Sequence, residues 1–262
     1  MPAQPDRDVV STLAVIPARL GATRLPRKPL RLLAGAPLVI RVWQRVTALN
    51  VADRCVIATD HPDVAAAAKT AGAECVMTSP LHPSGTDRVA EVSGRPEYAR
   101  YEVIVNIQGD EPFLPPAAVR GAAAIVTEGR FTLGTAAAHA TRDALAAPQV
   151  VKVVCATDGR ALYFSRAPIP FLRDDAEAAE RDRLVRQHIG IYAYTAESLA
   201  RWVALPPHAL ERVEGLEQLR PLAAGMPMGV ATVADSLAGG IDTEDDLRRA
   251  NERWPDLIAE RE

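Results

Sequence analysis

The sequence has few aromatic residues and no long apolar run, and each shortage excludes a class of protein. Only 5% of its 262 residues are aromatic, which argues against the base-stacking platforms of single-strand nucleic-acid binders. No uninterrupted apolar stretch reaches the ~18 residues that a membrane-spanning helix needs. Residues 1–8 are polar and lack the apolar core of a signal peptide, so we expect residues 1–10 to form a flexible tail.

Cysteine is also scarce, and the charge is nearly balanced. Cys55, Cys75 and Cys155 each lie in an apolar run, and an odd number without paired spacing predicts neither a disulfide framework nor a zinc site. We therefore expect small core residues in a reducing, cytoplasmic environment. The net charge of −3, from 30 basic and 33 acidic residues, is not that of a general nucleic-acid binder. Composition predicts a globular protein with no nucleic-acid or membrane partner.

Short apolar segments alternate with helical patterns in the first half of the chain. Strands are expected at Leu13–Ile16, Cys55–Ala58, Cys75–Thr78 and Val103–Ile107. Helices are expected between them at Leu38–Leu49, Pro62–Ala71 and Thr86–Val92. Such alternation predicts an α/β fold, in which a mostly parallel or mixed sheet is sandwiched by helices.

The second half of the chain is less regular. Strands are expected at Val150–Ala156, Ala161–Phe164, His188–Tyr194 and Met228–Val233, and a helix at Thr243–Arg253. The charged, alanine-rich run Arg173–Arg183 is typical of an exposed helix or a mobile loop. Because no repeat or composition break divides the chain, we expect one domain over residues 11–258, with an embellishment at about 160–225.

A basic loop follows the first apolar run and carries Arg19, Arg24, Arg27 and Lys28. Ligands of α/β proteins bind outside the carboxyl ends of the strands, and fixed cations there suit a polyphosphate such as a nucleoside triphosphate. The P-loop pattern and the dinucleotide glycine fingerprint are both absent, so arginine and lysine side chains must supply much of the charge. A solvated basic loop is the alternative interpretation.

Two acidic positions fit the divalent cation that polyphosphate chemistry usually requires. Asp110 follows a buried strand, directly after Gly109, where a turn or capping role is the alternative. Asp242 precedes Thr243, which together with Asp246 imitates a capping box that does not need Asp242. Mg²⁺ takes few carboxylate ligands and completes its shell with water and phosphate, so both positions are candidate metal ligands.

Three further places admit a functional and a structural interpretation. His188 begins an apolar strand. It is either a ligand-binding residue or a core histidine whose ring nitrogens are hydrogen-bonded within the protein. The segment Ser84–Arg88 lies at the start of a helix. It could bind a base or a phosphate, or it could serve only as the beginning of that helix. Glu217 and Arg220 lie three residues apart in a helical pattern, at a spacing that could form a surface ion pair.

Taken together, the segments closely resemble the 3-deoxy-manno-octulosonate cytidylyltransferase family, from about Leu13 to Arg249. The matching pieces, in family order, are IPARLGATRLPRKPL, ATDHPDVA, SGTDRVAEV, VNIQGDEP, VKVV, ALYFSRAPIP, HIGIY, LEQLR and GIDTEDDL. Related CMP-sialate synthetases share the basic loop but match HIGIY and LEQLR less well. The resemblance implies a Rossmann-like nucleotidyltransferase fold with an extension that forms a homodimer.

The resemblance also implies an activity and a set of site residues. CMP would pass from CTP to 3-deoxy-D-manno-octulosonate (Kdo), releasing pyrophosphate and activating the sugar for lipopolysaccharide biosynthesis. The implied CTP contacts are Arg19, Arg24, Lys28, Ser84, Gly85 and Arg88. The implied Mg²⁺ ligands are Asp110 and Asp242, which with Arg24 and Lys28 form the catalytic group. The implied Kdo pocket comprises Gln108, Arg166, His188, Tyr192, Glu217 and Gln218.

The chain departs from the family pattern at three places. Ala22 stands where the family often has serine, which removes a hydroxyl from the basic loop. Arg27 stands where glycine is common, so it either adds charge to the loop or faces water. Gln187 precedes His188 and displaces Arg186 from a place that is often basic, so Arg186 is not assigned to the sugar pocket.

Two other functions share part of this pattern. A nucleotidyltransferase acting on a sugar 1-phosphate would have the same basic loop and acidic site, although HIGIY and LEQLR favour Kdo. A CTP-sensing paralogue without turnover is the second alternative, and the presence of both Asp110 and Asp242 argues against it.

Overall fold

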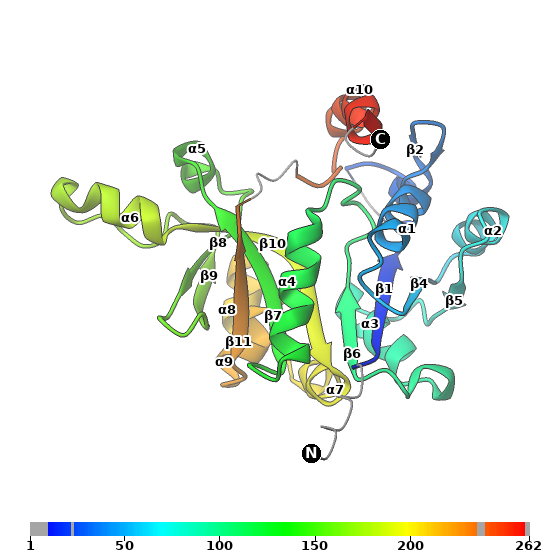
Figure 1. Cartoon of the computed structure of the whole chain (residues 1–262), viewed down its shortest axis with the longest axis horizontal. Helices are drawn as coiled ribbons and strands as arrows, with labels where there is room; N and C mark the ends of the chain where they lie inside the picture. Colours follow the sequence, from blue (N-terminus) through cyan, green and yellow to red (C-terminus); the bar gives the residue numbers. More distant parts are fainter. Residues whose placement is uncertain (1–9, 22–23, 235–238, 260–262) are drawn as a thin grey trace, which may run out of the picture.

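A computed structural model describes residues 10–21, 24–234 and 239–259, so that almost all of the expected N-terminal tail lies outside the described residues. Its centre is a sheet with the strand order β11-β7-β10-β6-β1-β4-β5 (Figure 1). These strands are β1 (Thr12–Ala18), β4 (Arg54–Thr59), β5 (Cys75–Met77), β6 (Val103–Asn106), β7 (Leu133–His139), β10 (Arg186–Thr195) and β11 (Met228–Val233).

The sheet is mixed because one central strand runs against its neighbours. β10 pairs antiparallel with both β6 and β7, whereas β1 is parallel to β4 and β6, and β11 is parallel to β7. The expected α/β class with a mostly parallel or mixed sheet is confirmed. Residues 160–225, expected to form an embellishment, also contain this central strand β10.

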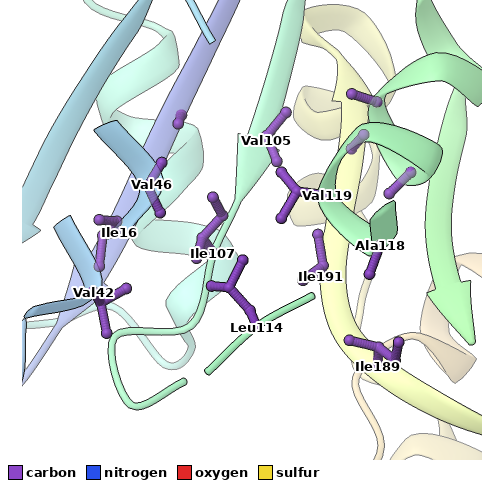
Figure 2. Packing of buried hydrophobic residues seen from close by; sticks show 14 of the residues in the cluster. Ile16, Val42, Val46, Val105, Ile107, Leu114, Ala118, Val119, Ile189 and Ile191 are labelled. Carbon is purple, nitrogen blue, oxygen red and sulfur yellow. The ribbon is translucent and has the colours of Figure 1, made fainter. Parts of the chain in front are cut away.

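Helices cover both faces of the sheet, and the alternation of side chains along β1 shows why. Ala14 and Ile16 lie in the core beneath α1 (Leu38–Leu49), α2 (Pro62–Thr70) and α4 (Pro116–Thr127). Leu13 and Val15 point to the opposite core, beneath α3 (Gly85–Ser93) and α7 (Ala196–Ala204). Figure 2 shows the first core, where Ile16, Val42 and Val119 lie close to residues of β6 and β10. Burial on both faces explains why residues 13–16 form the continuous apolar run that predicted this strand.

All the expected strands and helices are present, with their ends shifted by a few residues, but several elements were missed. Among the missed elements are α4, α5 (Arg142–Ala146), β7, α7 and α8 (Ala209–Glu214), whereas α9 (Leu219–Ala223) overlaps the helical pattern seen at residues 216–220. The run Arg173–Arg183 contains a short 3₁₀ turn, η3 (Asp175–Glu177), and most of helix α6 (Ala178–Leu184), which is largely exposed. None of the helices within the described residues is long and apolar enough to cross a membrane.

A hairpin beside the main sheet completes the part that positions the site. Its strands are β8 (Lys152–Cys155) and β9 (Ala161–Ser165), which pair antiparallel. β8 also pairs with the start of β10, so the hairpin extends the sheet at one end only. The C-terminal helix α10 (Glu244–Ala259) packs on the opposite side, against the short strand β2 (Leu32–Leu33).

Candidate active site

A cavity of about 370 Å³ opens at the carboxyl ends of β1 and β6. All the residues that the sequence analysis assigned to CTP line it: Arg19, Arg24, Lys28, Ser84, Gly85 and Arg88. Gly109 also lines it, and a Cβ there would lie only 2.9 Å from the carbonyl oxygen of Pro17. Glycine is therefore required because the two strand ends approach each other closely, which fixes the position of the following Asp110.

Lys28 lies between the two acidic residues of this cavity. It begins the short 3₁₀ helix η1 (Lys28–Leu30), and its Nζ donates to Asp110 Oδ2 and, over 2.7 Å, to Asp242 Oδ1. Burial alone lowers the pKa of Lys28, but the two carboxylates outweigh it and raise that pKa above its usual value. The ammonium is therefore charged at neutral pH and neutralises the carboxylates it joins.

The same two carboxylates fit the requirements of a divalent cation. Both reach one ammonium, so their oxygens converge on a small region. Across the described ranges, no cluster of three or more histidine, cysteine, aspartate or glutamate side chains could hold a metal. A pair of carboxylates fits Mg²⁺, which keeps water and phosphate ligands, and does not fit a site built entirely from protein side chains.

The beginning of α10 holds Asp242 in place. Asp246 Oδ2 accepts from the backbone N–H groups of Asp242 (3.1 Å) and Thr243 (2.9 Å), and Thr243 Oγ1 accepts from the Asp246 N–H (3.2 Å). The expected capping arrangement is thus confirmed, and it leaves the Asp242 carboxylate available. That carboxylate accepts from Arg24 Nη2 over 2.8 Å as well as from Lys28.

A second cavity, of about 520 Å³, adjoins the first. Its walls include Glu111, residues 149–151, residues 187–190 and the glycines at 239 and 240. Arg24 and Asp242 line both cavities, so the two spaces meet at these side chains. Ligands bound in the two cavities would lie next to each other at that junction, as a transfer between two substrates requires.

His188 lies in the wall of the second cavity as a neutral, hydrogen-bonded side chain. Its Nε2 is 2.9 Å from Thr135 Oγ1, and its ring lies 5.0 Å from that of Phe164 and 5.5 Å from that of Tyr192. Burial lowers the pKa of His188 to about 3. It can therefore donate or accept a hydrogen bond at neutral pH but carries no charge toward an anionic ligand.

The pKa of His188 predicts a specific loss of stability in acid. The unfolded chain takes up a proton near the usual histidine pKa, whereas the folded protein does not until the pH approaches 3. Stability is therefore lost as the pH falls through this window, by about 2 kcal/mol between about pH 7 and pH 5 from this residue alone. Urea unfolding of the wild type and His188→Gln at both pH values measures it, with the smaller decrease expected for the variant. Equal decreases would show that His188 titrates normally.

The other residues of the expected Kdo pocket are placed differently. Gln108 lines the first cavity, and Arg166, Tyr192, Glu217 and Gln218 line neither cavity within the described part of the chain. Arg166 donates from Nε to the carbonyl oxygen of Glu214 (2.8 Å) and from Nη1 to that of Pro148 (3.3 Å). Tyr192 and Gln218 are both buried, and the Tyr192 ring contacts that of His188.

The expected surface pair of Glu217 and Arg220 is wrong. Arg220 is buried and donates to the two carboxylate oxygens of Glu211, with 2.8 Å from Nε to Oε2. Glu217 accepts from Thr86 Oγ1 over 2.7 Å, at the beginning of α3. The helix α9 begins only after Gln218, so the two residues do not share a helical face.

Arg27 lines neither cavity, and its backbone adopts a conformation that suits the glycine expected here from the family resemblance. Arg27 has a φ of 56°, in the left-handed region that favours glycine, and its Nη2 lies 2.5 Å from Asp63 Oδ2 at the start of α2. Arg186 Nη1 donates to backbone carbonyl oxygens, including that of Val185 (3.2 Å). Ala22 lies outside the described residues.

Glu111 is a cavity residue that the sequence analysis missed. Burial first, and then the charge of the neighbouring Asp110, raise its pKa to about 8, although Lys28 lowers it. Glu111 therefore lines the second cavity with a carboxyl group that holds its proton more tightly than a free glutamate. Its position directly after Asp110 was the signal available in the sequence.

A basic cavity that holds a pair of carboxylates and meets a second cavity at one of them, on an α/β sheet, defines a class. The class is that of the nucleotidyltransferases, which move a nucleotide from a triphosphate to an acceptor held beside it. Comparison with known proteins gives the family within this class. The model of the family described as "Cytidylyltransferase" matches residues 13–228.

Relatives over nearly the whole chain agree. A 3-deoxy-manno-octulosonate cytidylyltransferase of Gemmatimonas aurantiaca is 62% identical over 247 residues, covering 94% of this chain and 95% of the relative. The enzyme of the same name from Actinobacillus pleuropneumoniae serotype 7 is 44% identical over 242 residues, covering 90% of this chain and 96% of the relative. The chain belongs to the 3-deoxy-manno-octulosonate cytidylyltransferase family.

A solved structure has the same fold. The structure of a CMP:2-keto-3-deoxy-manno-octonic acid synthetase complexed with CTP matches with a TM-score of 0.86 and 35% sequence identity. The match covers 96% of this chain and 100% of that chain. The resemblance predicted from the sequence motifs is confirmed.

Proposed function

We propose that this chain transfers CMP from CTP to Kdo and releases pyrophosphate. The observation that carries the proposal is the junction of the two cavities at Arg24 and Asp242, which gives the nucleotide and the acceptor separate but adjoining places. The names of the similar proteins, and the CTP in the solved relative, support the choice of both substrates.

CTP is assigned to the first cavity, where cations and a helix start converge. Arg19, Arg24 and Lys28 provide charge for the phosphates. Ser84 and Gly85 bring the N-terminus of α3, which favours an anion or a polar base edge. Arg88 is buried and held by Thr78 Oγ1 and by Asp60, 3.3 Å away, so its direction into this cavity is fixed.

Asp110 and Asp242 are assigned to Mg²⁺, and their oxygens fit it. When bound, the ion supplies positive charge for the phosphates and lowers the pKa of an acceptor hydroxyl. The protein's part is to hold both carboxylates in place, Asp110 through the close contact at Gly109 and Asp242 through the cap of α10. We infer that Lys28 leaves the two carboxylates when CTP binds and then donates its hydrogen bonds to the phosphates of the nucleotide.

Kdo is assigned to the second cavity. His188 and Gln187 offer neutral polar groups there, and Arg24 offers charge for the carboxylate of the sugar. Arg166 would support the pocket through the carbonyl oxygen of Pro148, and Tyr192 through the ring of His188. Glu217 and Gln218 are assigned to the pocket on the family resemblance alone, and Gln108 would reach it from the nucleotide side. The anomeric hydroxyl would attack the α-phosphorus directly, in line with departing pyrophosphate, so positioning and charge stabilisation by Arg24 and Lys28 account for catalysis.

The active form is proposed to be a cytoplasmic homodimer. Large apolar side chains are exposed within residues 160–225, among them Phe171 (86% exposed) and Val213 (85% exposed). Exposed apolar side chains of this kind suit contact with a second copy of the chain. The three cysteines are free, as expected in a reducing compartment.

The proposal predicts pyrophosphate release from purified protein with Mg²⁺, CTP and Kdo together. Release should fall to background when either substrate or Mg²⁺ is omitted, and should be far slower with UTP, a sialic acid or a sugar 1-phosphate. A preference for the sugar phosphate would move the chain to the alternative transferase class. CTP binding without release under any of these conditions would indicate a sensing protein.

A further inference from the structure

Lys152 is a completely buried lysine directly behind the second cavity. Its Nζ donates to three backbone carbonyl oxygens, those of Ala147 (3.0 Å), Val150 (2.7 Å) and Arg166. An ammonium group has three N–H donors and no acceptor, so these three bonds use all its donors. A charge buried in this way persists only where its hydrogen bonds are satisfied.

Lysine is rare in this chain, which makes its presence here informative. Of the 30 basic residues, only Lys28, Lys69 and Lys152 are lysines, and the rest are arginines. Lys69 is exposed on α2, whereas Lys28 and Lys152 each bring a compact ammonium to several converging oxygens. A guanidinium presents its donors as a flat fork and cannot reproduce three bonds from one point.

The three carbonyl oxygens belong to segments that build the acceptor side of the site. Val150 lines the second cavity itself, next to Gln149 and Val151. The Val151 carbonyl oxygen in turn accepts from the N–H of His188 over 2.8 Å. On the strand side, Lys152 is paired in register with Gln187, another residue of the cavity wall.

Arg166 completes the connection from the other side. Its carbonyl oxygen accepts from Lys152, and its own Nη1 donates to the carbonyl oxygen of Pro148, 3.3 Å away. The two cations thus hold residues 147–150 against the end of β9. Among the described residues that line the first cavity, neither Lys152 nor Arg166 is found. The contacts of these two cations therefore support the second cavity, which is assigned to the acceptor.

We propose that Lys152 is a positioning residue for the acceptor: it fixes the wall formed by residues 149–151, through which His188 is held, and has no contact with the nucleotide. The inference rests on the proposed function, because it assigns the second cavity to the acceptor sugar. Misplacing a wall by about an ångström is enough to cost up to about a hundredfold in rate.

Steady-state kinetics of Lys152→Arg and Lys152→Met, beside Lys69→Met as the matched control, test the proposal. We expect the KM for Kdo to rise about tenfold or more in both Lys152 variants, with the KM for CTP within about twofold of the wild type. Lys69→Met should behave as the wild type. A similar rise in both KM values, or no rise for Kdo, in folded variants would overturn the positioning role.

A measurement on the unmodified protein decides the matter even if the variants fail to fold. Kdo should slow backbone amide exchange at residues 149–152 of the wild type, while CTP alone should not. Unchanged exchange at these residues with saturating Kdo would overturn the proposal. If the wild type releases no pyrophosphate from CTP and Kdo, the proposed function fails instead, whatever the Lys152 variants do.

Discussion

Replacing Asp110 with asparagine is expected to lower kcat by about a thousandfold or more, a barrier increase of ~4 kcal/mol. The substitution removes the charge of one of the two carboxylates that converge on Lys28 in the first cavity. Asparagine binds Mg²⁺ far less well, and the charge on the transferring phosphate then lacks part of its compensation. The fold should survive, because Lys28 keeps its bond to Asp242 over 2.7 Å.

The matched control is Asp63→Asn. Asp63 is also an aspartate bonded to a cation, Arg27, but on the surface at the start of α2. Both variants should have far-UV circular dichroism like the wild type, and only Asp110→Asn should lose pyrophosphate release in a single-turnover assay. Turnover of a folded Asp110→Asn protein near the wild-type rate would remove Asp110 from the metal site.

The sequence predicted the elements around the nucleotide because local pattern and burial agree there. Every residue of β1 from Leu13 to Ile16 is buried, since the two faces of the strand lie in different cores. A continuous apolar run ending in a basic loop was therefore enough to place the first cavity. The alanine-rich residues of α4 and β7 carry no comparable period, and they were missed.

The acceptor side was less predictable because its contacts join backbone groups distant in sequence. The antiparallel direction of β10 leaves no trace in an apolar pattern, although it decides which residues face the second cavity. Arg166 and Lys152 bond to carbonyl oxygens, which every residue type possesses. Glu217 and Arg220 have the spacing of a helical pair, but tertiary partners were stronger: Thr86 for one and Glu211 for the other.

Lys28→Met is expected to have two effects of opposite sign. It should lower kcat/KM for CTP by about a hundredfold, ~2.7 kcal/mol, because a charge that would face the departing pyrophosphate is lost. It should also raise the affinity of the nucleotide-free protein for Mn²⁺ by about tenfold, since no ammonium then neutralises Asp110 and Asp242. The KM for Kdo should change little.

Electron paramagnetic resonance titration of Mn²⁺, without nucleotide, measures the second effect, with Lys69→Met as the control. In the wild type, we expect metal and lysine to compete for the same two carboxylates, so that metal binds well only when phosphates take the ammonium away. By reciprocity, a CTP analogue should strengthen Mn²⁺ binding more in the wild type than in Lys28→Met. If the variant binds Mn²⁺ no better than the wild type, Lys28 does not compete with the metal, and the loss in CTP use reflects phosphate binding alone.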